Sequence, residues 1–98
     1  MHQWNVVIGA AIDDLRTRAK KLVQDVWEQN RAASRIVGVI HTVSDNRWHT
    51  LRFNDESTAE NWFAHVTQDP SGYTYAACFG CRDEYRERPP FIEKIGAK

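Results

Sequence analysis

Residues 36–53 read IVGVIHTVSDNRWHTLRF, and this stretch decides most of the expected fold. Residues 36–43 are apolar on both alternating faces and rich in β-branched side chains, which is typical of a central strand covered on two sides. The polar residues 44–46 favour a turn. In residues 47–53 only one of the two alternating faces is mainly apolar, so we expect a half-exposed strand at an edge of the sheet.

A long amphipathic helix is expected before these strands. No proline or glycine interrupts residues 10–33, which allows a helix of roughly 25 residues, with Asn5 as its N-cap. Apolar residues recur along it at alternating steps of four and three, which places them in one stripe. The residues of this stripe are Ile8, Ile12, Leu15, Ala19, Leu22 and Val26.

Val23 and Trp27 make this stripe wider than a two-residue seam. We therefore expect one edge of the stripe to cover the sheet and the other edge to meet the same helix of a second copy, giving a homodimer. The residues expected at this dimer interface are Ile12, Leu15, Ala19, Leu22, Val26 and Trp27.

The rest of the chain supplies one more helix and one more strand. Residues 57–60, Ser-Thr-Ala-Glu, match a capping box at the start of a short helix. Residues 69–72 break the chain before a strand at 73–79. The expected fold is α+β in the order α-β-β-α-β, with a right-handed crossover and a three-stranded antiparallel sheet in the order 2-1-3. We expect one domain at 1–88 and an extended tail at 89–98.

The composition indicates a globular protein and narrows the classes of partner. Of the 98 residues, 42% are hydrophobic and 27% are charged, which fits one folded domain. Thirteen basic residues balance thirteen acidic ones, so no overall charge favours nucleic acid or membranes. The longest apolar stretch is too short to span a bilayer, and no signal peptide is evident. We therefore expect a cytoplasmic protein that does not contact membranes.

Cys78 and Cys81 enclose a two-residue spacer, a spacing that zinc sites and redox pairs use. Two cysteines are too few for a disulfide-stapled scaffold, and the same pattern also arises as two incidental thiols at a strand end. A three-residue turn would place His41 opposite His49, about 5 Å apart at Cβ, where two imidazoles can bind a metal or respond to pH. No third ligand is evident, so a metal- or thiol-dependent protein is an alternative to the main prediction.

Arg16, Arg18, Lys20 and Lys21 form a basic run in the first helix. Together with an exposed aromatic side chain they suit a nucleic-acid-binding regulator, which is a second alternative. Because the four cations point in several directions around the helix, and because some have i,i+4 carboxylate neighbours, an ordinary solvated helix face is the favoured interpretation.

No pattern in the sequence indicates catalysis. We find no glycine-rich phosphate loop, HExxH motif or serine nucleophile elbow, and we expect neither enzymatic activity nor a cofactor. Asp55 and Glu56 precede the second helix, where carboxylates interact favourably with the helix dipole, so a structural role accounts for them.

By elimination we expect a protein-protein binding module, such as a small phage or mobile-element inhibitor of a host complex. Aromatic and arginine side chains anchor interfaces, edge strands offer unpaired backbone groups, and a tail can dock on a partner. Because Tyr73 and Tyr75 share a face with Phe79 in the expected strand, the core is the alternative place for both. The expected partner-binding residues are Trp48, Arg52, Tyr73, Tyr75, Phe91 and Ile92.

Overall fold

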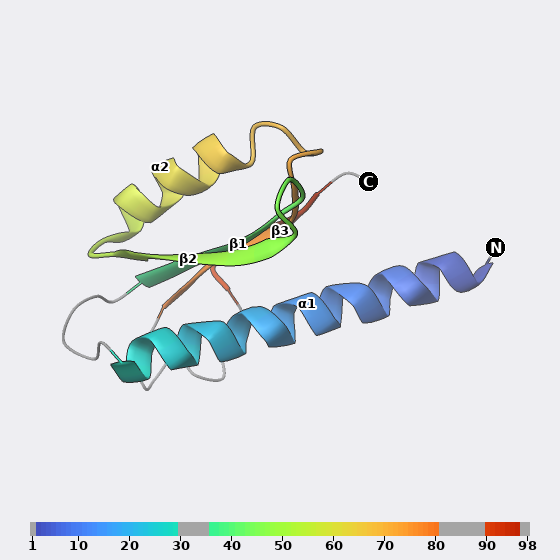
Figure 1. The fold of residues 1–98 in the computed structure, drawn as a ribbon, viewed down its shortest axis with the longest axis horizontal. Helices are drawn as coiled ribbons and strands as arrows, with labels where there is room; N and C mark the ends of the chain where they lie inside the picture. The colour runs from blue at the N-terminus through green and yellow to red at the C-terminus, as the bar shows by residue number, and fades with distance from the viewer. Residues whose placement is uncertain (1, 30–35, 81–89, 97–98) are drawn as a thin grey trace.

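The computed structural model describes residues 2–29, 36–80 and 90–96, with side chains described from residue 12 onward. These residues form two helices and a four-stranded antiparallel sheet in the order β2-β1-β3-β4 (Figure 1). The elements are α1 (His2–Gln29), β1 (Ile36–Thr42), β2 (Arg47–Phe53), α2 (Glu56–Val66), β3 (Tyr73–Gly80) and β4 (Ile92–Ile95).

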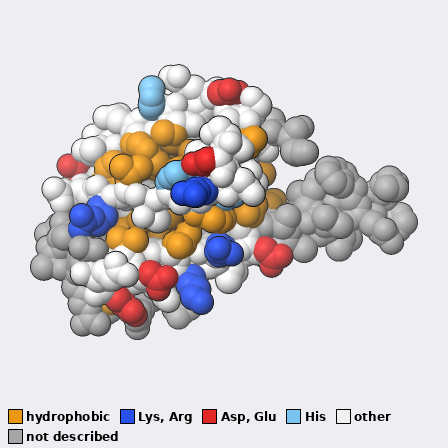
Figure 2. All heavy atoms as spheres, in the orientation of Figure 1, with side chains coloured by type: hydrophobic (Ala, Val, Ile, Leu, Met, Phe, Trp, Pro, Cys, Tyr) orange, Lys and Arg blue, Asp and Glu red, His pale blue; other side chains and the backbone are white. Residues whose placement is uncertain are grey.

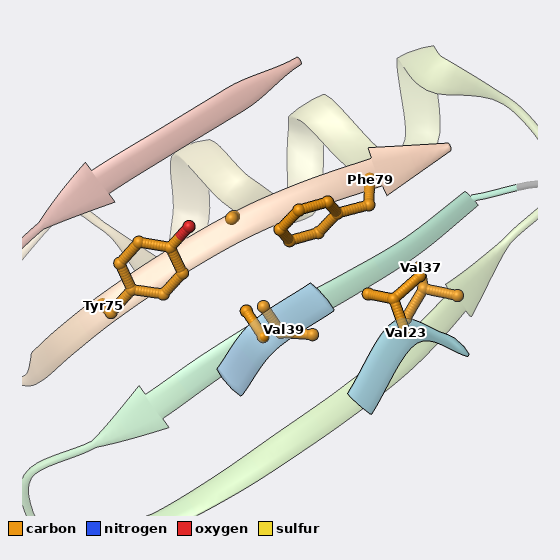
Figure 3. Close-up of a cluster of buried hydrophobic side chains, with 7 residues drawn as sticks. Val23, Val37, Val39, Tyr75 and Phe79 are labelled. Carbon is orange, nitrogen blue, oxygen red and sulfur yellow. The ribbon is translucent and has the colours of Figure 1, made fainter. Parts of the chain in front are cut away.

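The two helices cover opposite faces of the sheet, so the chain has a core on each side of β1 and β3 (Figure 1). This arrangement explains why β1 is apolar at every position from Ile36 to Ile40, since both of its faces are buried. The α1-side core consists of Ala19, Val23, Val37, Val39, Tyr75, Ala77 and Phe79 (Figure 3). The α2-side core consists of Ile36, Ile40, Ala59, Phe63, Tyr73, Ala76 and Cys78.

β4 is the main difference from the expected fold. The predicted order 2-1-3 is confirmed for the first three strands, but Ile92–Ile95, which we assigned to an extended tail, pairs antiparallel with β3. β3 is almost entirely buried, so its outer backbone groups need hydrogen-bond partners away from water. β4 supplies those partners, and Ile92 packs against the α2-side core.

The hairpin between β1 and β2 has a four-residue loop, and the predicted three-residue turn is wrong. Thr42 pairs with Arg47, and Asn46 takes a positive φ of 54°, which asparagine tolerates better than most residues. The extra loop residue shifts the register by one. His41 therefore lies opposite Trp48, and His49 lies opposite Ile40, so the predicted His41–His49 pair does not form.

A bulge near the start of β3 separates two tyrosines that we expected on one face. Tyr75 pairs with His41, whereas Tyr73 pairs with Thr42, so Thr74 is the extra residue between these pairs. Tyr75 consequently lies in the α1-side core and Tyr73 in the α2-side core.

Both helices begin before their predicted first residues. α1 starts at His2, so Asn5 lies within it and is not the N-cap. The N-cap of α2 is Asp55 and not Ser57 of the predicted capping box. The Asp55 carboxylate accepts hydrogen bonds from the Thr58 backbone N–H at 2.8 Å and from the Thr58 hydroxyl at 2.9 Å. These bonds start the helix two residues earlier than the box predicts.

Candidate functional site

β2 forms an edge of the sheet and is the longest exposed strand in the described part of the chain. It pairs with β1 on one side, and no strand within residues 2–29, 36–80 and 90–96 pairs with its other side. Alternate backbone N–H and C=O groups along its seven residues therefore point away from the sheet. The exposed residues of β2 are Arg47, His49, Thr50, Leu51 and Arg52.

Apolar side chains border this edge on both faces of the sheet. On the α1 face, Trp48 is half-buried and packs against the α1-side core. On the α2 face, Phe53 packs against Trp62 with ring centroids 5.4 Å apart, and Leu51 remains 43% exposed. Figure 2, in which β2 lies toward the viewer, shows hydrophobic side chains in the zones above and below the strand, with basic residues among them.

The flank of α1 on the β2 side of the sheet is also apolar. Arg16 contacts Glu93 in β4, which identifies the flank of α1 that faces β4. Residues follow one another by about 100° around a helix, so Leu15, Leu22 and Val26 lie on the opposite flank, toward β2. All three side chains are half-buried.

Arg16, Glu93 and Tyr75 form a polar network that joins α1, β4 and β3. Arg16 donates from Nε to Glu93 Oε2 at 3.1 Å, and a second guanidinium nitrogen donates to Oε1. The Tyr75 hydroxyl donates to Oε2 at 2.6 Å. The hydrogen bond from Arg16 is the main reason that the pKa of Glu93 is lowered, and burial raises the pKa of Tyr75.

Because of this network, one of the four cations of the basic run in α1 is paired within the chain. Arg16 is bound to Glu93 and also lies 3.6 Å from Asp13, so it is engaged within the chain. Arg18 and Lys21 are exposed and Lys20 is half-buried. The run therefore contributes fewer exposed cations than the sequence suggested.

The hairpin tip carries a second polar cluster, around Asp45. Its carboxylate accepts hydrogen bonds from the Thr42 hydroxyl and, at 3.2 Å, from the Arg47 backbone N–H, and its Oδ2 lies 2.9 Å from His49 Nε2. The bond from Thr42 is the largest cause of the lowered pKa of Asp45. All of these groups are local to the loop, which indicates that the cluster shapes the turn.

His41 lies on the other face of the sheet from His49. Its ring contacts Trp48 with centroids 5.2 Å apart, and its Nδ1 is buried with no hydrogen-bond partner among the described residues. His41 is also on the face opposite to Cys78, which is in the α2-side core. No group of three His, Cys, Asp or Glu side chains in the described ranges is arranged to hold a metal ion.

Cys78 is a core residue, whereas Cys81 lies outside the described residues. The Sγ atom of Cys78 lies 3.8 Å from the Ala59 carbonyl oxygen. Burial, with a smaller contribution from Glu60, raises the pKa of the Cys78 thiol to about 12. A thiol that stays protonated at neutral pH is a poor nucleophile and a poor metal ligand.

The structure divides the predicted partner-binding residues among three places. Trp48 and Arg52 lie on β2, where Arg52 is exposed. Phe91 and Ile92 lie at the opposite edge of the sheet, where Phe91 is 41% exposed. Tyr73 and Tyr75 are buried in the two cores, so neither belongs to an exposed surface of this chain.

Much of the stripe predicted to form a helix-helix dimer is used within the chain. Ala19 is fully buried, and Leu15, Val26 and Trp27 pack against the α1-side core. Ile12 and Leu22 are half-buried. The surplus width of the stripe is thus explained largely by the width of the sheet beneath α1.

Two exposed apolar residues near β2 were missed as candidates. Leu51 is in the middle of the edge strand, and Val43 in the hairpin loop is 54% exposed. Leu51 could have been found, because it is a large apolar residue in a strand that the sequence already placed at an edge. Val43 could not, because the three-residue turn placed it inside the first strand.

None of the described helices is long and apolar enough to cross a bilayer. Comparisons of the chain with protein-family models, with curated proteins and with solved structures gave no match.

Proposed function

We propose that this chain is a non-enzymatic protein-binding module that uses the outer edge of β2 to pair with an extended strand of a partner. The observation that carries the proposal is a seven-residue edge strand, five of whose side chains are exposed, bordered by apolar side chains on both faces. In strand addition, backbone hydrogen bonds supply affinity and the alternating side chains supply specificity.

The side chains of β2 suit selective pairing. Leu51 and the half-buried Trp48 offer apolar contact on opposite faces of the sheet. Arg47 and Arg52 add positive charge at either end of the strand, and charges on an edge disfavour indiscriminate strand pairing. A partner strand with aromatic or acidic residues opposite the two arginines would be accepted in preference to others.

The two alternative functions, a metal- or thiol-dependent protein and a nucleic-acid-binding regulator, have less support than strand pairing at β2. The buried Cys78 thiol has a pKa of about 12, which does not favour thiol chemistry. Arg16, the first residue of the basic run, is held by Glu93. The β2 edge combines exposure with residue types that suit binding.

The test is an affinity pull-down from host lysate treated with nuclease, with Thr50→Lys as the β2 variant and Gln24→Lys as the matched control. Both positions are exposed, and Gln24 lies on α1, away from β2. We expect the wild type and the Gln24→Lys variant to retain the same protein, which can be an untagged copy of this chain, and the Thr50→Lys variant to lose it. A partner retained equally by all three proteins would exclude the β2 edge as the binding surface.

A further inference from the structure

Building on the proposed use of the β2 edge, we infer that the strand it pairs with is β2 of a second copy of this chain. The two strands run antiparallel about a two-fold axis that passes beside Thr50. Two four-stranded sheets then join into one continuous sheet, with both copies of α1 on one face and both copies of α2 on the other.

Symmetry leaves few ways to pair the strands. Residues directly opposite in an antiparallel pair lie on the same face of the sheet, and a two-fold axis perpendicular to the sheet preserves that face. In every symmetric register, therefore, one residue faces its own copy. Thr50 is the central residue of Arg47–Phe53, so the register centred on it pairs the whole of β2. Registers centred on His49 or Leu51 would pair only residues 47–51 or 49–53.

The Thr50-centred register also matches the side chains. Trp48 lies opposite Arg52 of the second copy, and Arg47 lies opposite Phe53 of the second copy, so each arginine meets an aromatic ring. The remaining pairs are His49 with Leu51 and Thr50 with itself, and a threonine pair is favourable across strands. No two like charges face each other. A His49-centred register would instead place two imidazoles opposite each other.

Charge at the ends of β2 favours the same occupant. Arg47 of one copy lies opposite Phe53 of the other copy. Phe53 comes only two residues before Asp55 and three before Glu56. The side chains of Arg47 and Phe53 share the α2 face, the face on which Asp55 and Glu56 open α2. Each exposed guanidinium therefore approaches the two carboxylates of the other copy, and the symmetry repeats this attraction at both ends.

This dimer differs from the helix-helix dimer that the stripe in α1 predicted. α1 packs over β1 and β3, so the two α1 axes are separated by about four strand spacings, roughly 19 Å. Packed helices approach to about 8–10 Å, so the two copies of α1 do not contact each other. Trp48, Thr50 and Arg52 of both copies lie in the space between them, on the face that Leu15, Leu22 and Val26 border.

Sedimentation velocity of Thr50 charge variants tests this inference. We expect the wild type and Gln24→Lys to sediment at twice the monomer mass of 11.4 kDa. Thr50→Lys places two ammonium groups opposite each other at the axis, and Thr50→Glu does the same with two carboxylates, so each variant alone should dimerise at least tenfold more weakly. An equimolar mixture of the two variants should recover a dimer with one copy of each. This recovery also shows that both variants are folded.

A disulfide checks the register. In a Cys81→Ser background, Thr50→Cys should form a disulfide-linked dimer under mild oxidation, whereas His49→Cys should not, because His49 faces Leu51 of the second copy. Efficient cross-linking of His49→Cys alone would overturn the Thr50-centred register.

Two other outcomes separate this inference from the proposed function. A wild type that stays monomeric at high concentration, but captures another protein that Thr50→Lys loses, would overturn the second copy as the occupant and retain strand pairing at β2. If Thr50→Lys changed neither the sedimentation mass nor the partner captured in the pull-down, both proposals would be overturned.

Discussion

Tyr75 donates its hydroxyl to Glu93 Oε2 at 2.6 Å, from a ring that is fully buried in the α1-side core. The carboxylate of Glu93 thus brings negative charge to the border of an apolar cluster, where Arg16 neutralises it. A buried hydroxyl without such an acceptor would cost free energy, so the network allows a tyrosine to fill this part of the core.

The network predicts acid-sensitive stability. The hydrogen bonds from Arg16 and Tyr75 lower the pKa of Glu93 below its ordinary 4.5. The ionised Glu93 side chain therefore stabilises the fold fully above pH 4.5, and this stabilisation is lost as the pH falls through the folded-state pKa. Glu93→Gln should lower the free energy of unfolding by about 1 kcal/mol at neutral pH, since the pair is partly exposed. At about pH 3 the wild type and the variant should differ less.

Urea unfolding at both pH values measures this difference. Asp25→Asn, which removes an exposed carboxylate from α1, is the control and should show no comparable convergence with the wild type. A gap between wild type and Glu93→Gln that stays constant from neutral to acidic pH would contradict a role for the charge of Glu93.

Gly38 permits a close approach between β1 and α2. A Cβ at this position would lie 2.5 Å from Cζ3 of Trp62 and 3.0 Å from Cε2 of Phe53. Gly38→Ala should therefore lower the free energy of unfolding by about 1–3 kcal/mol through overpacking. Thermal unfolding should also show that Trp62→Leu and Gly38→Ala are less destabilising together than the sum of their separate effects.

Gly72→Ala is the matched glycine control for Gly38. A Cβ there would meet its nearest neighbour, the Asp69 carbonyl oxygen, at 3.4 Å, which is ordinary contact. Its stability should stay close to that of the wild type. If Gly38→Ala behaved in the same way, Trp62 would not be held over the strand.

The N-cap of α2 gives a prediction that separates two neighbouring residues. Asp55→Ala removes the acceptor for the Thr58 N–H and should lower the Tm clearly, whereas Ser57→Ala should leave the Tm nearly unchanged. Differential scanning calorimetry of the two variants measures this. The reverse ranking would support the capping box in place of Asp55.

Cys78 should resist alkylation while the chain is folded. With a pKa of about 12, on the order of one thiol in ten thousand is ionised near pH 8, and the side chain is fully buried. In a Cys81→Ser background, iodoacetamide should modify Cys78 only as fast as the chain unfolds, and quickly in urea, as mass spectrometry can follow. Rapid modification of the folded protein would indicate an accessible thiolate.

The sequence was sufficient to predict the centre of the fold. β1 was recognised because burial on both faces requires apolar residues at successive positions, and β2 because only one of its alternating faces is mainly apolar in sequence. β4 was missed because its four residues are too few to show a clear period, and Glu93 and Lys94 make the segment look solvated. The structural role of Glu93 depends on its hydrogen bond with Arg16, which is 77 positions away in the sequence. The local sequence pattern around Glu93 does not show this partner.

The candidate site was predicted in part. Trp48 and Arg52 were placed on an edge strand, and the structure puts both there. Tyr73 and Tyr75 were assigned to the same surface, because alternation along a strand assumes that no residue is inserted. The bulge at Thr74 inserts such a residue in β3. In the β1–β2 hairpin, the loop has one residue more than predicted, and this moved His41 and His49 out of register with each other.

The pairing of Arg16 with Glu93 bears on how the chain folds as it is synthesised. α1 leaves the ribosome before the sheet does, because the carboxylate that holds Arg16 is translated 77 residues later, and the tyrosine beside it 59 residues later. Until β1 and β3 have been synthesised, the apolar stripe of α1 has no sheet to cover. Completion of this domain is therefore a late, cooperative event that awaits its last strand.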